Sequence, residues 1–323
     1  MVIYQLKIIE EIYIKKMANF TISGISDYVK TNQDALVKDV VLGGVKGDTI
    51  ANLTKQLGIK TKERLNYLNV DPVLQDGSAC GFSAQGSTVF TERDLETAQF
   101  KAQDEYCDKL LLGKFAEYQV KIAANKTEAD IPFGQVIMDE IIKGINTKME
   151  RLVWLGDKSG SDLIDGFITL AKADAATVDV TIASGTSVFD AVKAVISAIP
   201  ENILDKAVVF LSPALYRAYI FELVEKNFYH FNPAEGEPVD MFFPGTSVKV
   251  HKTIGLTGNK RDIYASAYEN MFYGADLMND NEVVKVWYDD NTELFKYSVR
   301  WNAGVMTAYP DMVVLGSAAA DLV

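Results

Sequence analysis

Residues able to do covalent chemistry are few in this chain of 323 residues, which contains two cysteines, Cys80 and Cys107, and two histidines, His230 and His251. A nucleophilic cysteine needs a nearby base, so the only catalytic pair available is Cys80 with His230 or His251. Cys80 lies in "SACGFS", a strand-and-turn context rather than a helix N-terminus that would lower the thiol pKa. We interpret Cys80 as a packed thiol in a turn, with a cysteine hydrolase as the less favoured alternative.

Two other kinds of segment have the residue types of ligand sites but not the spacing. Asp289, Asp290 and Glu293 are close in sequence, yet the oxygen spacing and central glycine of a calcium loop are absent, and a solvated hairpin turn fits better. "GGVKGDT" (43–49) and "GLTGNKRD" (255–262) lack the closing Gly-Lys-Ser/Thr of a phosphate loop. The first is interpreted as a flexible joint. The sequence therefore predicts no metal, no cofactor and no enzymatic activity.

Composition limits the classes of partner. The chain carries 32 basic and 44 acidic side chains, a net charge of −12, which disfavours binding of nucleic acid through phosphate neutralisation. Hydrophobic residues make up 48% of the chain, enough for a sizeable core. No apolar run reaches membrane length, and two cysteines provide no disulfide framework.

The strongest predicted element is an amphipathic helix from about Phe133 to Leu155. Its apolar stripe recurs at 4-3-4-3 spacing and consists of Met138, Ile142, Ile145, Met149 and Leu152. The opposite face is predicted to carry Asp139, Lys143, Asn146, Thr147 and Glu150. Pro132 precedes the helix, and Gly156 is expected to end it in the left-handed conformation.

Before this helix the pattern is β, and after Asp174 it is mixed. A charged β excursion is expected over 65–103, with a hairpin tip at "AQGS" (84–87), and a helix over 105–123. Such a long, poorly buried excursion is costly unless a neighbouring subunit covers it. Later elements are expected as strands at 177–182, 206–212, 247–254, 262–267 and 271–276, helices at 187–199 and 213–226, and a hairpin of 282–288 with 294–301.

The order of several motifs resembles the major capsid proteins of tailed bacteriophages. A long helix ends in "RLVWLGD" and is followed by "DGFITLAKA"; then come "AVVFLSPALYRAYI", "VKVHKTIGL" with "RDIYASAYENMFYGADL", and the final "YSVRWNAGVMTAYPDMVVL". The resemblance extends from about Thr21 to Leu315. It implies the α+β shell fold named for phage Hong Kong ninety-seven, which encapsulins share, with the long helix as its spine.

The resemblance also implies a domain organisation. The residues of 1–16 themselves, rich in Ile, Lys, Tyr and Glu, are interpreted as translated upstream sequence or as an extension of the arm, with Met17 expected to be the working start. The remaining parts are an N-terminal arm (17–64), an extended loop (65–104), a peripheral domain (105–172 and 268–323) and an axial domain (173–267).

The implied function is self-assembly, through hexamers and pentamers, into an icosahedral shell around double-stranded phage DNA without sequence-specific binding. Portal, scaffold or decoration proteins are possible partners, no membrane is involved, and the location is the virion, with the host cytoplasm during assembly. An encapsulin-type nanocompartment is the alternative shell. No lysine occurs between Lys62 and Lys101, so the loop lacks the side chain for an isopeptide bond between subunits.

Four charged residues of the extended loop are predicted to lie at the subunit interface. They are Glu92, Arg93, Asp94 and Glu96. A folded monomer has no evident use for such charges, whereas complementary groups on a neighbouring subunit would set the register of the contact.

Overall fold

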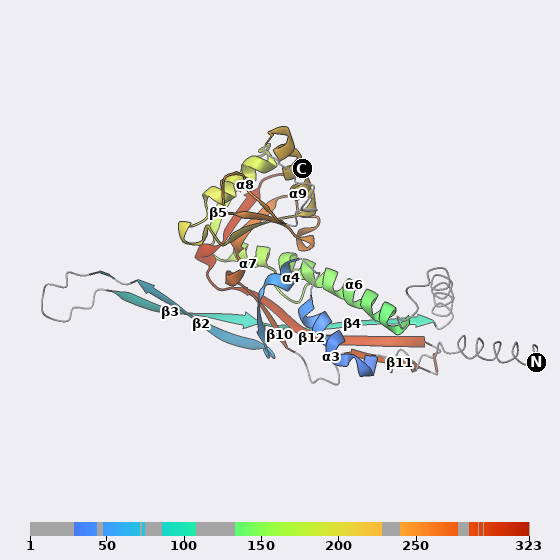
Figure 1. Ribbon diagram of the computed structural model, residues 1–323. Helices are drawn as coiled ribbons and strands as arrows, with labels where there is room; N and C mark the ends of the chain where they lie inside the picture. Colours follow the sequence, from blue (N-terminus) through green and yellow to red (C-terminus); the bar gives the residue numbers. More distant parts are fainter. Residues whose placement is uncertain are drawn as a thin grey trace, which may run out of the picture. The chain divides into compact units, whose positions relative to one another are not determined.

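The computed structural model describes residues 29–43, 48–71, 73–74, 86–107, 133–227, 240–276, 284–289, 291–292 and 294–322 (Figure 1). Contacts divide the chain into two compact units. The first comprises Met1–Val40, Phe100–Ile145 and Leu277–Trp301, and the second Val41–Gln99, Asn146–Asp276 and Asn302–Val323. We describe each unit by itself.

The second unit contains a six-stranded sheet of order β5-β13-β9-β6-β8-β7. Its strands are β5 (Val178–Ile182), β13 (Val314–Ala318), β9 (Asp262–Ala267), β6 (Ala207–Leu211), β8 (Lys249–Lys252) and β7 (Asp240–Phe242). The helices α8 (Val188–Ser197) and α9 (Pro213–Glu225) pack together with this sheet. Each begins at a serine that accepts a backbone N–H, Ser187 from Asp190 and Ser212 from Leu215. These strands and helices confirm the pattern predicted for the later part of the chain.

Both faces of this sheet are buried, which explains the unbroken apolar run of β6. Val209 and Leu211 face the core formed with α8 and α9. Phe210 points to the other face, where its ring lies 4.9 Å from the ring of Trp154. Trp154 comes from the end of α6 (Phe133–Leu155) and also contacts Phe167 of α7 (Phe167–Ala173).

The rest of the second unit is built from shorter pieces. β1 (Thr54–Leu57) pairs in parallel with β10 (Met271–Asp276), which pairs antiparallel with the end of β12 (Leu294–Thr307). β2 (Lys62–Asp71) and β3 (Ser87–Glu96) form a separate two-stranded ribbon. The second unit also contains short helical segments: α4 (Thr49–Asn52), η2 (Glu201–Ile203), η3 (Ile254–Leu256), η4 (Tyr268–Asn270) and η5 (Pro310–Met312).

The first unit contains α3 (Gln33–Lys38), which continues into the π-helical turn η1 (Asp39–Gly43), and a sheet in which the start of β12 lies between β4 (Ala98–Cys107) and β11 (Val284–Asp289). The predicted hairpin of β11 and β12 is confirmed. Its buried face carries Phe295, Tyr297, Val299 and Trp301, as the alternation predicted. The helix predicted from Glu105 is wrong at its start, because Glu105, Tyr106 and Cys107 belong to β4; residues 108–132 lie outside the described part.

Helix α6 has the predicted bounds, Phe133–Leu155. Four members of the predicted stripe are buried, but Leu152 is only half-buried, and Val153 and Trp154 are buried beside it. The polar face is wrong at two positions, because Asn146 and Glu150 are also buried. Glu150 is inside because its Oε1 accepts the backbone N–H of Ile50 at 3.0 Å.

The end of α6 is set by close packing of two glycines rather than by a left-handed residue. Gly156 does not have a positive φ, so that prediction is wrong. A Cβ on Gly156 would lie 2.5 Å from the carbonyl oxygen of Ile164, and one on Gly166 would lie 2.6 Å from that of Trp154. The Gly166 N–H donates to the Gly156 carbonyl at 2.9 Å. The turn between them therefore folds back onto the helix end, which explains the spacing of Leu-Gly-Asp and Asp-Gly-Phe.

The segment interpreted as a flexible joint is anchored at its described end. Asp48 and Thr49 are buried. Asp48 Oδ1 accepts the N–H of Thr49, and its Oδ2 accepts the N–H of Ile254, both at 2.8 Å. Thr49 Oγ1 in turn accepts the indole N–H of Trp154 at 3.0 Å. These contacts fix the start of α4, so a joint does not extend to Asp48 and Thr49.

Candidate functional site at the base of the β2–β3 ribbon

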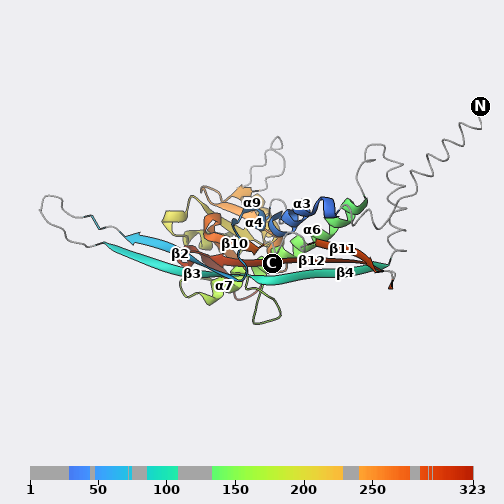
Figure 2. The ribbon, with the colours of Figure 1, turned by 90° about the horizontal axis from the view of Figure 1, so that it is seen from below.

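The β2–β3 ribbon is the described element least able to stabilise itself. Its strands pair over ten positions, from Lys62 opposite Glu96 to Asp71 opposite Ser87, and within the described residues they pair with no other strand. Both views show the two strands side by side (Figures 1 and 2). Isolated two-stranded ribbons are marginal in water, so contacts at the base decide how this one is held. Ala84 and Gln85 of the predicted hairpin tip lie outside the described residues.

Strand alternation divides the four predicted interface residues between two faces. Glu92, Asp94 and Glu96 share one face with Lys62 and Arg64 of β2. Arg64 lies 2.8 Å from Glu92 and 3.1 Å from Asp94, and Lys62 lies 2.8 Å from Asp94. Hydrogen bonds from Lys62 and Arg64 lower the pKa of Asp94. Contrary to the expectation that a monomer has no use for these charges, each already has a partner in the same chain; their interface role stays a prediction.

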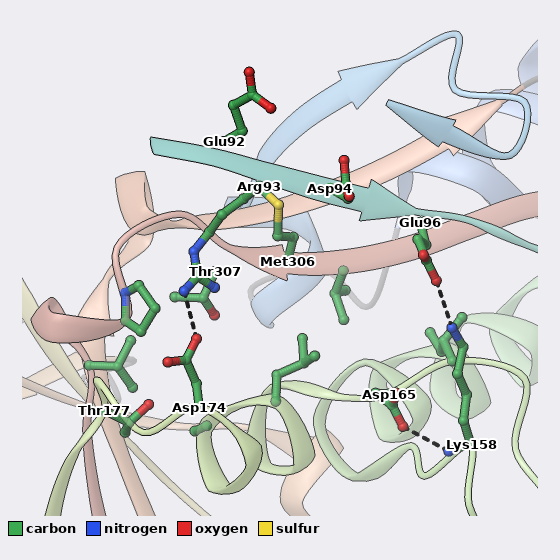
Figure 3. A pocket seen from close by; sticks show the side chains of 16 residues that line it. Glu92, Arg93, Asp94, Glu96, Lys158, Asp165, Asp174, Thr177, Met306 and Thr307 are labelled. Carbon is green, nitrogen blue, oxygen red and sulfur yellow. Dashed lines mark hydrogen bonds and ion pairs between the residues drawn. The ribbon is translucent and has the colours of Figure 1, made fainter. Parts of the chain in front are cut away.

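Arg93 points to the opposite side of β3, towards Asp174 at the end of α7 (Figure 3). Its Nη2 donates to Asp174 Oδ2 at 2.6 Å, and both side chains are about three-tenths exposed. Partial burial raises the pKa of Asp174, but hydrogen bonds from Arg93 and from the Ala176 N–H outweigh it, so that the pKa is lowered. Asp174 follows directly after α7, so this ion pair ties β3 to the end of that helix.

Lys158 makes the second tie between β3 and the turn that follows α6. Its Nζ lies 3.1 Å from Glu96 Oε2, and its backbone N–H donates to Asp165 Oδ1 at 2.8 Å (Figure 3). Hydrogen bonds from Lys158 and then from Lys62 lower the pKa of Glu96. The Gly-Asp turn that follows α6 thus supplies a cation to the base of the ribbon.

Between these two ion pairs the ribbon is seated in a notch made by two glycines. Gly274 of β10 and Gly304 of β12 are register partners. A Cβ on Gly304 would lie 2.0 Å from the carbonyl oxygen of Glu96, and one on Gly274 would lie 2.9 Å from the side chain of Leu95. Leu95 is fully buried there and packs with Ile59 and Met306. Because Gly274 and Gly304 have no side chain, β3 can lie directly on the β10–β12 pair.

A cavity of about 370 Å³ lies beside this seat. Arg93, Lys158, Asp165, Asp174 and Thr177 contribute polar groups, and the described residues that line it include no histidine or cysteine. Within the described part of the chain no three His, Cys, Asp or Glu residues are grouped as a metal site would require.

The residues of the alternative chemistries do not come together in the described part. Cys80 and His230 lie outside it. His251 is buried on β8, with its ring edge-on to Phe210 at 5.9 Å. In the acidic group at 289–293, Asp289 Oδ2 accepts a hydrogen bond from Lys296 at 2.8 Å, and that bond chiefly lowers the pKa of Asp289 to about 2. Asp289 therefore serves as an ion-pair partner within the β11–β12 hairpin.

A search of the described helices for a long apolar segment finds none that would cross a membrane. No protein-family model matches the sequence, and no curated protein matches it.

Comparison with solved structures identifies the fold. A chain from Gordonia phage Cozz superposes with a TM-score of 0.58 at 12% identity, covering 85% of this chain and 87% of the other. A capsid chain of a native GTA particle gives 0.58 at 12% identity, with 85% and 90% covered. A chain of the satellite phage P4 procapsid gives 0.55 at 10% identity, with 90% and 98% covered. The chain thus has the fold of phage capsid structures, which confirms the predicted α+β shell fold of the Hong Kong ninety-seven type.

The Arg93–Asp174 ion pair gives a first test of the site. Replacing Arg93 with glutamate breaks the pair and places two carboxylates together, so we expect the free energy of unfolding to fall by about 1–2 kcal/mol. This is more than the near-zero effect expected of a fully exposed charge. Exchanging the pair, Arg93→Glu with Asp174→Arg, should restore most of the loss. Denaturant titration measures both.

The control for this test is Lys193→Glu on α8, which makes the same change of charge at an exposed site. Because the folded pKa of Asp174 is lowered, the contribution of the pair is present above the unfolded pKa of about 4 and is lost as pH falls through the folded pKa. Equal effects of Arg93→Glu and Lys193→Glu at pH 7 would show that the pair does not hold the ribbon.

Proposed function

We propose that this chain is a major capsid protein that self-assembles into an icosahedral shell enclosing double-stranded phage DNA. The observation that carries the proposal is the shared fold, which covers most of this chain and most of chains from a GTA capsid and the P4 procapsid. A structural rather than an enzymatic role is part of this proposal, because the solved structures that share the fold are capsids.

The β2–β3 ribbon supports assembly through contacts with neighbouring copies. Its ten-residue strands make their described strand pairs only with each other, although its base is fixed by two ion pairs and the buried Leu95. A ribbon tied at one end, whose strands pair with no other strand among the described residues, suits contact with a second subunit. In the proposed shell, hexamers and pentamers provide that cover, with Glu92, Asp94 and Glu96 on the accessible face.

The domain division proposed from the sequence fits this role. The extended loop (65–104) contains most of the ribbon, the peripheral domain (105–172 and 268–323) contains α6, and the axial domain (173–267) contains α8 and α9. The turn between Gly156 and Gly166 then lies just before the axial domain and braces the ribbon through Lys158.

The partners proposed beyond the chain itself follow from its charge and its role. A net charge of −12 suits a wall that encloses DNA without sequence-specific binding. Portal, scaffold or decoration proteins are further partners of a virion shell assembled in the host cytoplasm. The lack of lysine between Lys62 and Lys101 argues for a shell held by non-covalent contacts of this loop.

Electron microscopy of the purified full-length protein tests the proposal. We expect pentamers, hexamers or closed shells, because the ribbon needs a neighbour to cover it. A protein that remains a folded monomer at every concentration would contradict the capsid function. Closed shells that carry a cargo enzyme and exclude DNA would instead identify a nanocompartment, and hydrolytic activity abolished by alkylation of Cys80 would favour the hydrolase.

A further inference from the structure

One face of the sheet in the first unit gathers positive charge in a chain that is acidic overall. The other face of this sheet is buried and aromatic, with Phe100 stacked on Trp301 and Tyr106 on Tyr297. Alternation places the intervening side chains of β4, β12 and β11 on the opposite face. We name this the basic sheet face, and its defining residues are Lys101, Lys285, Trp287, Lys296 and Arg300.

Contacts between β4 and β12 fix their register on this face. Gln103 Nε2 donates to Ser298 Oγ at 3.0 Å, and Lys296 Nζ lies 3.9 Å from Glu105 Oε2. The next position along the two antiparallel strands brings Lys101 opposite Arg300. Both are exposed, and neither forms an ion pair with another residue of the described chain. Like charges directly opposite each other on a sheet are destabilising, so an external anionic group would relieve this pair.

β11 adds an exposed aromatic ring and another cation. Trp287 is 42% exposed and is the register partner of Lys296, while Lys285 is exposed opposite Ser298. Among the described residues of β4, β11 and β12, the carboxylates on this face are Glu105 and Asp289, both next to Lys296. The face therefore has an excess of cations around a partly exposed indole.

We propose that the basic sheet face docks the acidic surface of a second copy of this chain. The inference rests on the proposed function and deepens it by naming one surface of a subunit contact. A second copy carries 44 acidic against 32 basic side chains, a net charge of −12 that attracts these cations. Because the basic face meets a different, acidic surface, the contact is heterologous, the kind that forms a ring of subunits when the rotation between neighbours closes.

The residue types favour a protein partner over nucleic acid. Tryptophan and arginine are enriched in the centres of protein interfaces, where Trp287 and Arg300 would both become buried. Double-stranded DNA leaves no unpaired base for an exposed indole to stack on, and the net charge of −12 repels a polyanion.

The test compares Arg300→Glu with Lys193→Glu, which makes the same change of charge on an exposed α8 position of the second unit. The melting temperature should not fall in either variant, since both positions are exposed and a glutamate at 300 replaces a like-charge pair with an opposite-charge pair to Lys101. Particle counts in electron micrographs should fall about tenfold or more for Arg300→Glu alone, because the like-charge contact recurs at every interface. Trp287→Ala should lower particle yield in the same direction without any change of net charge.

Salt and nucleic acid content complete the test. Raised salt should partly restore Arg300→Glu shells, because it screens the new repulsion. If Arg300→Glu shells form in normal yield, the inference is overturned. If those shells form normally but contain less DNA than the wild type, the basic sheet face binds nucleic acid instead. If the wild-type protein forms no shells, the proposed function fails. If the wild type forms shells and the variants Arg300→Glu and Trp287→Ala form them in equal yield, only this inference fails.

Discussion

Replacing Trp154 with alanine is expected to lower the free energy of unfolding by about 3–5 kcal/mol, the range for truncating a buried aromatic side chain. Trp154 is fully buried, and its ring lies 5.5 Å from Phe167, 4.9 Å from Phe210 and 5.3 Å from Tyr264. These partners come from α7, β6 and β9. The substitution therefore leaves a cavity where the end of α6 meets one face of the six-stranded sheet.

The indole N–H adds a polar component to this loss. It donates to Thr49 Oγ1, which also lies 3.1 Å from Thr253 Oγ1. Trp154→Phe keeps most of the ring contacts and removes this bond, so its cost should be smaller, about 1–3 kcal/mol. Denaturant titration followed by circular dichroism measures both variants.

The matched control is Trp287→Ala, because Trp287 is 42% exposed in the isolated chain. It should change subunit stability by less than about 1.5 kcal/mol, well below Trp154→Ala. Similar losses for the two tryptophans would contradict the assignment of Trp154 as the central packing residue of this junction.

Gly304→Ala is expected to have the second large effect, a loss of about 3 kcal/mol or more, because the new Cβ meets backbone. The contacts are 2.0 Å to the Glu96 carbonyl oxygen and 3.1 Å to the Thr97 Cα. No rotamer change relieves them, so β3 must move away from β12. Leu95 would then leave its buried position, and the ion pairs of Arg93 and Glu96 would lengthen.

Gly144→Ala in α6 is the control for Gly304→Ala, since a Cβ on Gly144 meets nothing within 4 Å. Alanine favours a helix over glycine, so this variant should gain up to about 1 kcal/mol. Thermal melting compares the two, and protease cleavage within the ribbon should increase only in Gly304→Ala. A Gly304→Ala protein that melts with the wild type would rule out the glycine notch as the seat of the ribbon.

Local patterns in the sequence determined the elements. The stripe of α6 recurs over about four turns of the helix, and the bounds of the helix were predicted correctly. The alternation from Phe295 to Trp301 predicted the β11–β12 hairpin and its buried face for the same reason, because a period is a property of neighbouring residues. The shell fold was predicted from the resemblance of the ordered motifs to phage major capsid proteins.

The candidate site was predicted only in part. The sequence pointed to Glu92, Arg93, Asp94 and Glu96 as one charged group, whereas the strand separates Arg93 from the other three. The alternation of side chains along β3 already places position 93 on the opposite face from 92, 94 and 96, so the sequence contains this division. The partner Asp174 is 81 positions away, and no local pattern points to it.

Tertiary structure alone decided which polar residues and glycines matter. Helical spacing assigned Glu150 to the solvent face, but a backbone N–H brought in from Ile50, 100 positions away, made burial favourable there. Gly156 reads locally as a helix end, yet its missing Cβ makes room for the carbonyl of Ile164. The missing Cβ of Gly304 likewise makes room for the carbonyl of Glu96. A sequence period records which side of an element a residue occupies, while the chain that later packs against that side determines what the residue does there.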